Sequence, residues 1–410
     1  RASPATSAAR AERPTVSGPG TEGEERTIPG RHARAALRLL RDEGPLSRIA
    51  LAERLRLSPT TITHTVNPLL AAGWLEELDT TGAHERRGRP AVALRGVPEA
   101  VTVAGIQLGV GMIRAGLADG LARVRGVRVA EFDPRMPVED VLALAAAEVR
   151  AVIADDRGAP PSSVGVAAPG AVDETGRVNT LAVNLGWREV AIADVLEREL
   201  GAPVHAEHNV RAMALAEAHY ADVPPSGRHR ASSLAYVYLR KRLGLGLVMH
   251  GSVSRGGAHG VSELGHIQVD PSGPRCPCGN RGCLETLTST VHLRARLEAA
   301  GADLTGVDDL DILTVVDAAR GTPVHDEFIG RMAQGLSIVA NLTGPDAIVL
   351  GGSFAAAPDR LFDDLAVATA AATFPLVRPS VVIRRARLVE GGVAGAAAVA
   401  LDATVYGAPA

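Results

Sequence analysis

From Val101 onward the sequence alternates short apolar segments with longer helical ones. The apolar segments that stand out are VTVAGIQLGV (101–110), SVGVAAPGAV (163–172), SSLAYVYLR (232–240), LGLGLVMHG (243–251) and DAIVLGGS (346–353). Short apolar runs bounded by glycine and polar residues are typical of buried strands, and the stretches between them are long enough for helices. Strands that alternate with helices form sheets covered by helices. The pattern therefore predicts α/β lobes over this part of the chain.

The composition limits what else the chain can be. It has 410 residues, of which 46% are hydrophobic, which is enough for two or three domains with separate cores. The formal net charge is -3, so a nucleic-acid partner would have to be met by a local basic patch. The sequence shows neither a membrane-length apolar run nor the charged-then-apolar start of an export signal. We expect no membrane contact and a cytoplasmic location.

The first part of the chain has a different character. Residues 1–27 are rich in Pro, Ser, Gly, Ala and Glu, which predicts a disordered tail. Residues 28–97 show helical periodicity instead, and three helices are expected, the second and third capped by Ser47 and Ser58. Their apolar positions are Ala36, Leu37, Leu39 and Leu40, then Ile49, Ala52 and Leu55, then Ile62, Val66, Leu69 and Leu70.

The third helix leaves short polar side chains on its other face. They are Ser58, Thr60, Thr61, Thr63, His64 and Asn67. Small hydroxyl and amide groups reach base edges in the major groove, so we predict that these residues contact DNA. Pro68 lies inside the same helix and lacks a backbone donor, so a kink or an early end near Asn67 is expected.

Two strand-like segments, WLEEL (74–78) and PAVALRG (90–96), flank a charged turn and complete the pattern of a winged helix-turn-helix domain over residues 28–97. The turn contains Arg86, Arg87 and Arg89, whose guanidinium groups suit phosphates or a narrow minor groove. Residues 28–97 hold eleven arginines and seven acidic residues, which gives this segment a charge of +4. The alternative is a small helical protein-interaction module with a solvated loop.

All three cysteines of the chain lie within eight positions, at Cys276, Cys278 and Cys283, and His266 precedes them. An odd, closely spaced set cannot pair completely as disulfides, and in a reducing compartment it is more typical of thiolate metal ligands. Gly279 and Gly282 supply the turns that bring such ligands together. The alternative is a tight loop with three buried cysteines.

The order of motifs along the chain resembles the ROK family of sugar kinases and sugar-responsive transcriptional repressors. The motifs are GVAAPGAVDETGRV (165–178), NLGW (184–187), GVSELGH (260–266), CPCGNRGCLE (276–285), IVLGGS (348–353) and AGAAAVAL (394–401). The resemblance implies an actin-like, sugar kinase-type fold of two α/β lobes around a cleft, preceded in the repressors by a winged helix. One lobe is expected to comprise residues 98–219 plus 392–410, and the other, with the cysteine loop, residues 220–391.

The resemblance also implies ligands. In the family a histidine and three cysteines placed like His266, Cys276, Cys278 and Cys283 hold one structural zinc ion, which fits a closed tetrahedral site. Glu263, His266 and Glu285 stand where the family binds the hydroxyl groups of a sugar. Carboxylates suit this role because each accepts several hydrogen bonds. The same likeness adds His208, Asn209, Gly170 and Asn184 to the predicted sugar-binding residues.

Three departures from the kinases of the family argue against catalysis. The turn that binds phosphate and metal in the kinases is replaced by a segment with Gln107, Val110 and Gly111, and Asn209 stands at the position of the general base. An amide cannot take a proton from a sugar hydroxyl. The second phosphate loop is replaced by the basic triplet Arg240, Lys241 and Arg242. We therefore predict no catalytic residue and no enzymatic activity.

The basic triplet has two interpretations. Three cations at this place suit an anionic effector such as a sugar phosphate, or they form a solvated strand end or a subunit contact. The sequence thus predicts a DNA-binding repressor that a sugar or sugar phosphate releases from its operator. A homodimer or tetramer is expected on a palindromic site. Activation of transcription, in place of repression, stays open. The alternative is a sugar kinase with a degenerate nucleotide site and an added helix-turn-helix.

Overall fold

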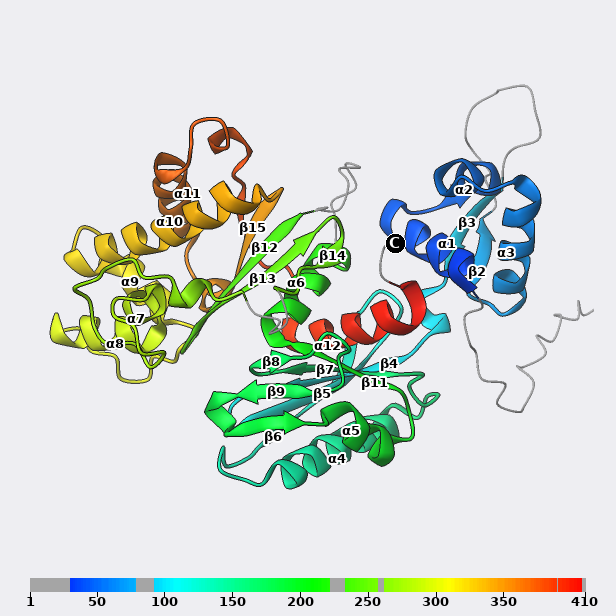
Figure 1. Cartoon of the computed structure of the whole chain (residues 1–410), viewed down its shortest axis with the longest axis horizontal. Coiled ribbons are helices and arrows are strands. Elements are labelled where there is room, and N and C mark those ends of the chain that lie inside the picture. Colours follow the sequence, from blue (N-terminus) through cyan, green and yellow to red (C-terminus); the bar gives the residue numbers. More distant parts are fainter. Residues whose placement is uncertain (1–29, 79–91, 222–232, 257–261, 389, 408–410) are drawn as a thin grey trace, which may run out of the picture.

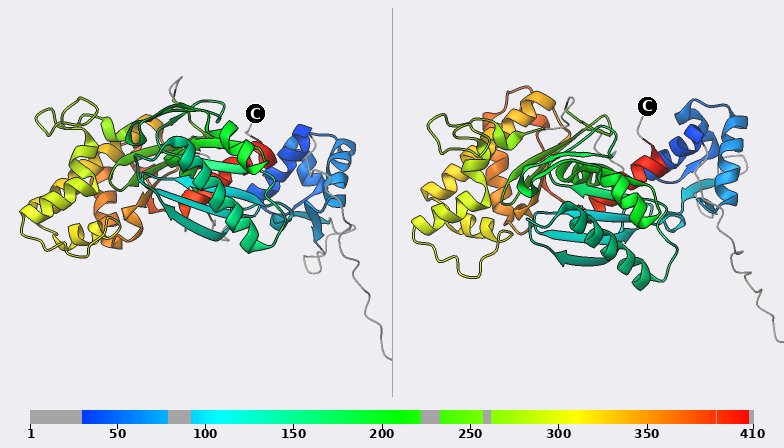
Figure 2. Two further views of the ribbon diagram at one scale, coloured as in Figure 1. Left: turned by 90° about the horizontal axis from the view of Figure 1, so that it is seen from below. Right: turned by 60° about the horizontal axis from the view of Figure 1, so that its bottom comes forward.

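The structure is a computed structural model that describes residues 30–78, 92–221, 233–256, 262–388 and 390–407. The predicted tail, residues 1–27, and the wing arginines Arg86, Arg87 and Arg89 lie outside these ranges. The described elements form a small helical domain and two larger α/β units (Figure 1). Figure 2 shows that the C-terminal helix, in red, ends beside the helical domain, in blue. No helix in the described ranges has the length and apolarity needed to cross a bilayer.

The helical domain contains three helices and a small sheet. Its elements are α1 (Gly30–Glu43), β1 (Leu46–Ser47), α2 (Arg48–Leu55), α3 (Pro59–Ala71), β2 (Leu75–Leu78) and β3 (Ala93–Gly96). β3 pairs antiparallel with both β1 and β2, so the strands after α3 return to the segment between α1 and α2. The predicted winged helix-turn-helix fold is confirmed, and so are its two caps, because Ser47 Oγ and Ser58 Oγ accept from the backbone N–H groups of Ala50 and Thr61.

Two details of this domain differ from the prediction. Ile49 is 67% exposed, whereas Leu51 is completely buried. An α-helix turns about 100° per residue, so Ile49 lies about 200° around α2 from Leu51 and faces away from the core. Of the two outcomes predicted at Pro68, a kink or an early end near Asn67, the prediction of an early end is wrong, because α3 continues through Pro68 to Ala71. Burial of Leu69 in the last turn compensates for the missing backbone donor of Pro68.

The first α/β unit is built on a five-stranded sheet in the order β11-β7-β4-β5-β6. Its elements are η1 (Pro98–Ala100), β4 (Val103–Leu108), β5 (Met112–Ala118), β6 (Val124–Glu131), α4 (Val138–Asp156), β7 (Val164–Ala168), α5 (Ile192–Leu200) and β11 (Val204–His208). A small antiparallel sheet projects from it and consists of β8 (Ala171–Val172), β9 (Asn179–Ala182) and β10 (Trp187–Val190), with η2 (Val183–Leu185) between the last two. β7 runs parallel to β4 and to β11.

The second α/β unit has another five-stranded sheet, in the order β14-β13-β12-β15-β16. Its strands are β12 (Leu234–Leu239), β13 (Leu243–Met249), β14 (Ser252–Val253), β15 (Ala347–Gly352) and β16 (Ile383–Arg385). Its helices are η3 (Leu264–His266), α7 (Leu284–Thr288), α8 (Thr290–Ala299), α9 (Ile312–Ala318), α10 (Pro323–Thr343), η4 (Ser353–Ala355), α11 (Asp359–Ala372) and η5 (Arg378–Ser380). Each of the five apolar segments singled out in the sequence contains a strand, so the α/β prediction is confirmed.

Two helices lie between the sheets and join the units. They are α6 (Asn209–His219) and α12 (Gly391–Leu401), and α12 continues into a π-helical turn, η6 (Asp402–Tyr406). α12 packs on β4 and β7 of the first sheet, and α6 packs on β12 and β13 of the second. The two helices also pack on each other, and nearly every residue of both is buried. The chain therefore has a common helical layer at its centre (Figure 1).

Candidate functional site

The loop between η3 and α7 brings His266, Cys276, Cys278 and Cys283 together. Their ligand atoms all lie within 4.8 Å of one another. His266 Nδ1 is 3.5 Å from Cys276 Sγ, and Cys278 Sγ is 3.7 Å from Cys283 Sγ. Ligand atoms on a tetrahedral zinc ion with a metal–sulfur distance of about 2.3 Å would be about 3.6 to 3.8 Å apart, whereas a disulfide needs about 2.05 Å. The four residues fit a tetrahedral metal ion and not a disulfide.

The backbone of the loop holds this arrangement. The N–H of Cys276 donates to the carbonyl of Asn280 at 2.8 Å, and bridges join Gln268 to Cys283 and Arg275 to Arg281. Gly282 has a φ of +58°, and a Cβ there would overlap the carbonyl oxygen of Asp270. Only glycine allows the chain to turn so tightly at this point.

The thiols of the cluster differ in their surroundings. Burial raises the pKa of Cys283 to about 12. The pKa of Cys278 is lowered, chiefly because the backbone N–H of Asn280 donates to its sulfur. A buried thiol with a raised pKa stays neutral at neutral pH unless a cation stabilises the thiolate. The donor set thus suits a bound cation better than three free thiols.

The predicted sugar-binding side chains of this region lie around the same loop. Nε2 of His266, the ring nitrogen turned away from Cys276, is 3.9 Å from Glu263 Oε2. Glu285 lies on α7 and is almost buried, and its Oε2 accepts from the backbone N–H of Leu243 at 3.0 Å. A Cβ at Gly265, the residue before His266, would lie 3.4 Å from Glu285 Oε2. The structure therefore brings Glu263, His266 and Glu285 to one place.

Arg242 connects this group to the first α/β unit. Its Nη2 donates to Asn184 Oδ1 at 2.7 Å, and its Nη1 is 3.6 Å from Glu285 Oε1. Asn184 lies in η2, so the contact spans the two units. Of the basic triplet, Arg242 faces predicted sugar-binding residues, while Lys241 is exposed and the backbone carbonyl of Arg240 accepts from Thr290.

The other predicted sugar-binding residues lie at the start of α6 and at a tight turn. Asn209 Nδ2 donates to the carbonyl of Leu108 at 2.9 Å, and its buried Oδ1 has no partner among the described residues. Burial, with the nearby charge of Arg211, lowers the pKa of His208 to about 4. Gly170 has a φ of +78°, and a Cβ there would overlap the Leu181 carbonyl. Within the described ranges, no hydrogen bond or ion pair joins these three residues to Glu263, His266 or Glu285.

Next to Asn209 lies a buried ion-pair network that the sequence analysis missed. Glu207 is 1% exposed, and its Oε1 accepts from Arg211 Nε at 2.7 Å while its Oε2 accepts from Arg255 Nε at 2.8 Å. Glu207 lies near the end of β11 and Arg211 in the first turn of α6, four residues apart. An acidic and a basic residue so close in sequence, at the junction of two buried elements, were the sequence signal for such a network.

On the winged helix domain, α3 presents part of the predicted DNA-contacting face. Thr60, Thr63, His64 and Asn67 are exposed, but Thr61 is half-buried. The hydroxyl of Thr63 donates to the Pro59 carbonyl, and Ser58 Oγ is within 2.8 Å of Thr61 Oγ1 while it caps the helix. Thr60, His64 and Asn67 are therefore the exposed polar side chains of α3 that make no contact with the helix backbone or its cap among the described residues.

Comparisons with known proteins agree with this arrangement. Residues 103–403 match the ROK family, and residues 31–76 match a family of winged helix-turn-helix DNA-binding domains. The chain is 28% identical over 391 residues to the DNA-binding transcriptional repressor Mlc of Escherichia coli K12, which covers 92% of this chain and 94% of Mlc. It is 27% identical over 333 residues to the N-acetylglucosamine repressor of Escherichia coli O157:H7, across 78% of this chain and 79% of that protein.

A solved structure shows the same organisation over nearly the whole chain. The crystal structure of a ROK family transcriptional regulator, described as a homologue of the Escherichia coli MLC protein, superposes with a TM-score of 0.76 at 27% identity. The superposition covers 91% of this chain and 96% of that one. The chain belongs to the ROK family and carries the winged helix-turn-helix domain of a transcriptional regulator at its N-terminal end.

Proposed function

We propose that this protein is a DNA-binding transcriptional repressor of sugar or amino-sugar genes, released from its operator by a sugar or sugar phosphate. The observation that carries the proposal is the exposed polar face on α3 in a chain that belongs to the ROK family, and the family resemblance, which puts Asn209 where the kinases have a general base, supports it. Relatives that match most of the chain are repressors by name. Because such a protein acts on chromosomal DNA, we place its action in the cytoplasm.

The proposed effector site consists of Glu263, His266 and Glu285, with Asn184, Asn209, His208 and Gly170 on the opposite side. Two carboxylates and an imidazole in one place suit the vicinal hydroxyl groups of a sugar. Glu285 is held in position by the N–H of Leu243, so little rotamer freedom is lost when a sugar binds. The amide of Asn209 would orient a hydroxyl group, since its Oδ1 has no partner among the described residues.

The proposed cofactor is one structural zinc ion per chain, held by His266, Cys276, Cys278 and Cys283. All four positions of a tetrahedron would be filled by protein ligands, so the ion would rigidify the loop and leave no open position for chemistry. Binding through Nδ1 would fix the tautomer of His266, so that Nε2–H points toward Glu263 and a bound sugar.

The charge of Arg242 supports an anionic effector. The guanidinium lies between Asn184 and Glu285, so a phosphate on a sugar bound there would meet a cation that is already positioned. The same contact with Glu285 lowers the net negative charge of the site. A sugar phosphate is therefore proposed to bind more tightly than the neutral sugar.

The alternative, a sugar kinase, is not favoured. Asn209 cannot act as a base, because an amide accepts no proton at neutral pH, and its Nδ2 is engaged by the Leu108 carbonyl. By the family resemblance, Gln107 stands where the kinases carry a metal-binding acid. Incubation with ATP and a panel of hexoses and amino sugars tests this assignment, and release of ADP that depends on the sugar would overturn it.

Two copies of the chain are proposed to bind one palindromic operator, as a dimer or within a tetramer. A single α3 contacts only one half-site, and twofold symmetry of the protein matches that of the DNA. A mobility shift with duplexes selected from a random pool tests the central claim. The selected duplexes should be palindromic and should be released by at least one sugar or sugar phosphate of the panel. Binding without sequence preference would contradict it.

A further inference from the structure

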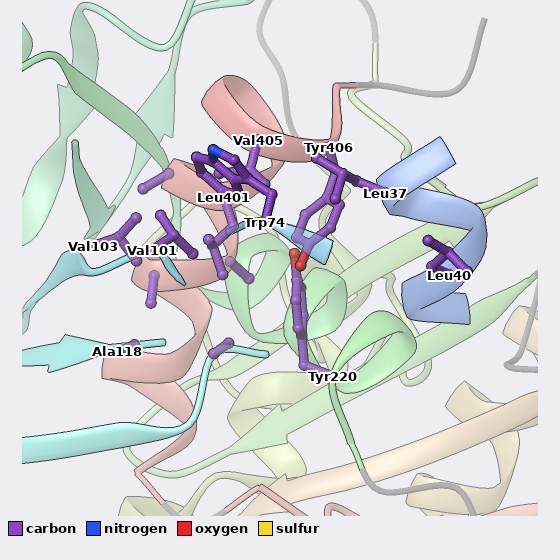
Figure 3. Packing of buried hydrophobic residues seen from close by; sticks show 14 of the residues in the cluster. Leu37, Leu40, Trp74, Val101, Val103, Ala118, Tyr220, Leu401, Val405 and Tyr406 are labelled. Atoms are coloured by element: carbon purple, nitrogen blue, oxygen red, sulfur yellow. The ribbon is translucent and has the colours of Figure 1, made fainter. Parts of the chain in front are cut away.

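The winged helix domain shares one hydrophobic core with the rest of the chain. Leu37 and Leu40 of α1 and Trp74 lie in the same buried cluster as Leu401 and Val405 of the C-terminal segment. Figure 3 shows these side chains packed around Tyr406, with the hydroxyl ends of Tyr406 and Tyr220 turned toward each other. The winged helix domain is thus packed against the kinase-like part, residues 98–407 with the two α/β units, and is not merely tethered to it.

Arg41, the third residue from the end of α1, lies at the centre of this contact. Its side chain is 2% exposed, and its Cζ is 5.1 Å from the ring centre of Tyr220 and 4.5 Å from that of Tyr406. Its Nη1 donates to Tyr220 Oη at 3.1 Å, and its Nη2 is 3.3 Å from His219 Nδ1. A guanidinium between two aromatic faces is fixed both in position and in direction.

The charge of Arg41 is balanced inside the contact. Its Nε donates to Asp42 Oδ1 at 2.7 Å. Asp402, in the π-helical turn after α12, is half-buried, and its partial burial raises its pKa against the opposing effect of Arg41 and Arg255. A buried guanidinium needs such partners, and moving it away from them leaves uncompensated charge. The geometry of the contact is therefore sensitive to where α6 and α12 end.

α6 runs from the proposed effector site to Arg41. It begins at Asn209 and ends at His219, directly before Tyr220. Eleven helical residues span about 16 Å. Every residue of α6 after Asn209 is buried, so α6 is closely packed along its length. A displacement of its first turn therefore moves the whole helix, including its end at His219.

α12 makes the same connection. A Cβ at Gly392, in its first turn, would overlap the side chain of Gln107, which the family resemblance places at the position of the kinase metal-binding acid. Its last turn leads into Val405 and Tyr406 beside Arg41. The two helices approach so closely that a Cβ at Gly395 would lie 2.9 Å from the carbonyl carbon of Ala212. α6 and α12 thus form one packed pair with both of its far ends at Arg41.

A further contact ties the β13–β14 connection to the same place. His219 Nε2 is 2.8 Å from the carbonyl oxygen of Gly251, and the chain after β14 carries Arg255, which pairs with Glu207 beside Asn209. Three segments of the two α/β units therefore meet at His219, Tyr220 and Tyr406, and Arg41 of the winged helix domain contacts all three of these side chains.

We propose that Arg41 is a positioning residue that fixes the orientation of the winged helix domain on the ends of α6 and α12 and so couples the effector site to DNA binding. This inference rests on the proposed function, since it requires a protein that binds both operator DNA and a sugar. Arg41 is buried and contacts no DNA itself. A change at the start of α6 or α12 alters the contact of Arg41 and, with it, the spacing of the two α3 helices on a palindromic operator.

The test compares the parent with Arg41→Lys and Tyr220→Phe. Arg41→Lys keeps the charge but loses the planar fork, and Tyr220→Phe removes only the hydroxyl that accepts from Arg41. Arg54→Ala is the matched control, because its ion pair with Glu43 stays within the winged helix domain. The affinity for a duplex selected by the parent is measured with and without glucose, N-acetylglucosamine and their 6-phosphates. Sugar binding is measured separately by calorimetry, and folding by thermal denaturation.

In the parent, at least one of these probes should change the dissociation constant for DNA by roughly 5- to 150-fold. The response is the ratio of the dissociation constants for DNA with and without the probe. In Arg41→Lys this ratio should fall to within about twofold of one, and in Tyr220→Phe it should fall by at least about threefold. The affinity of both variants for the sugar probe should change by less than about threefold. Arg54→Ala should keep the parent ratio. A folded Arg41→Lys protein that retains the parent ratio overturns the inference alone. A parent that binds DNA but responds to none of the probes overturns the proposed sugar response, and the inference with it.

Discussion

The guanidinium of Arg242 donates to Asn184 Oδ1 at 2.7 Å and thereby joins the β12–β13 connection to the small sheet of the first α/β unit. The same guanidinium is 3.6 Å from Glu285, so one cation serves two proposed sugar-binding residues. The resemblance to the kinases of the family predicts a loop for nucleotide phosphates at this position, whereas we propose that it belongs to the effector site.

Arg242→Gln should abolish the preference for a phosphorylated sugar. A charge-assisted hydrogen bond contributes about 1.5 to 3 kcal/mol, so the sugar phosphate should lose roughly 10- to 150-fold in affinity, while the neutral sugar changes by less than about threefold. Calorimetric titration with a sugar and its 6-phosphate measures both. Lys241→Gln is the control, because Lys241 lies on the same connection but its side chain makes no hydrogen bond or ion pair with the described residues, unlike that of Arg242. An Arg242→Gln protein that discriminates as the parent does would contradict this role.

One zinc ion should accompany each chain, and Cys278→Ser should remove it. Three ligands hold zinc far less well than four, and the metal-free loop between Gly273 and Glu285 should lose its fixed shape together with the orientation of His266. Elemental analysis of the purified protein measures the metal, and sugar binding should be lost with it. Arg275→Ala, an exposed change in the same loop, should keep both. Full zinc content in the Cys278→Ser protein would refute the ligand assignment.

Much of this architecture was predictable from local patterns. In the two five-stranded sheets, β4, β7, β12, β13 and β15 lie in the apolar segments bounded by glycine and polar residues, whereas β6 and β16 carry charged residues and were not singled out. Ser47 and Ser58 are caps because each precedes a helix with free N–H groups. The clustering of the three cysteines follows from their short spacing, whereas His266, ten residues before the first of them, was assigned through the resemblance to the ROK family.

Other features depend on contacts between distant segments. Ile49 and Leu51 are equally apolar and two positions apart, so the choice of the buried one depends on where α1 and α3 pack. Arg242 meets Asn184 across the two α/β units, and nothing in either segment shows this. Arg41 lies in line with Leu37 and Leu40 on the apolar face of α1, which was a local sign of burial, but its partners are 178 and more positions away.

Leu51→Ala and Ile49→Ala form a matched pair that tests the packing of α2. Leu51 is fully buried, so truncation should lower the free energy of unfolding by about 2 to 5 kcal/mol. Ile49 is 67% exposed, and its truncation should stay within about 0.5 kcal/mol. Urea denaturation of the isolated variants measures both. Equal losses for the two changes would show that α2 is rotated about its axis relative to this structure.

His64→Ala and Asn67→Ala should change the sequence preference at particular base pairs. Both side chains are exposed on α3, and a lost base contact costs about 1 to 3 kcal/mol at the pair it reads. Arg87→Ala, in the turn that the sequence predicts as the wing, should instead weaken binding to all duplexes and reduce the salt dependence. Competition between selected and random duplexes at two salt concentrations separates the two effects. Uniform weakening by all three changes would contradict base reading by α3.

The stability of the protein should fall between about pH 6.5 and pH 4, in part because of His208. Burial lowers the pKa of His208 to about 4, whereas in the unfolded chain it is about 6.5. Below pH 6.5 the unfolded state therefore binds a proton that the folded state excludes until the pH nears 4, and the free energy of unfolding decreases as the pH falls through this window.

The contribution of His208 should be about 1 to 3 kcal/mol, since each pKa unit corresponds to about 1.4 kcal/mol. Burial lowers the pKa of His205 and His292 in the same direction, so the parent alone does not isolate the effect. His208→Gln should lose less stability than the parent between pH 7 and pH 5 in urea denaturation, and an identical loss in both proteins would show that His208 is accessible to protons in the folded state.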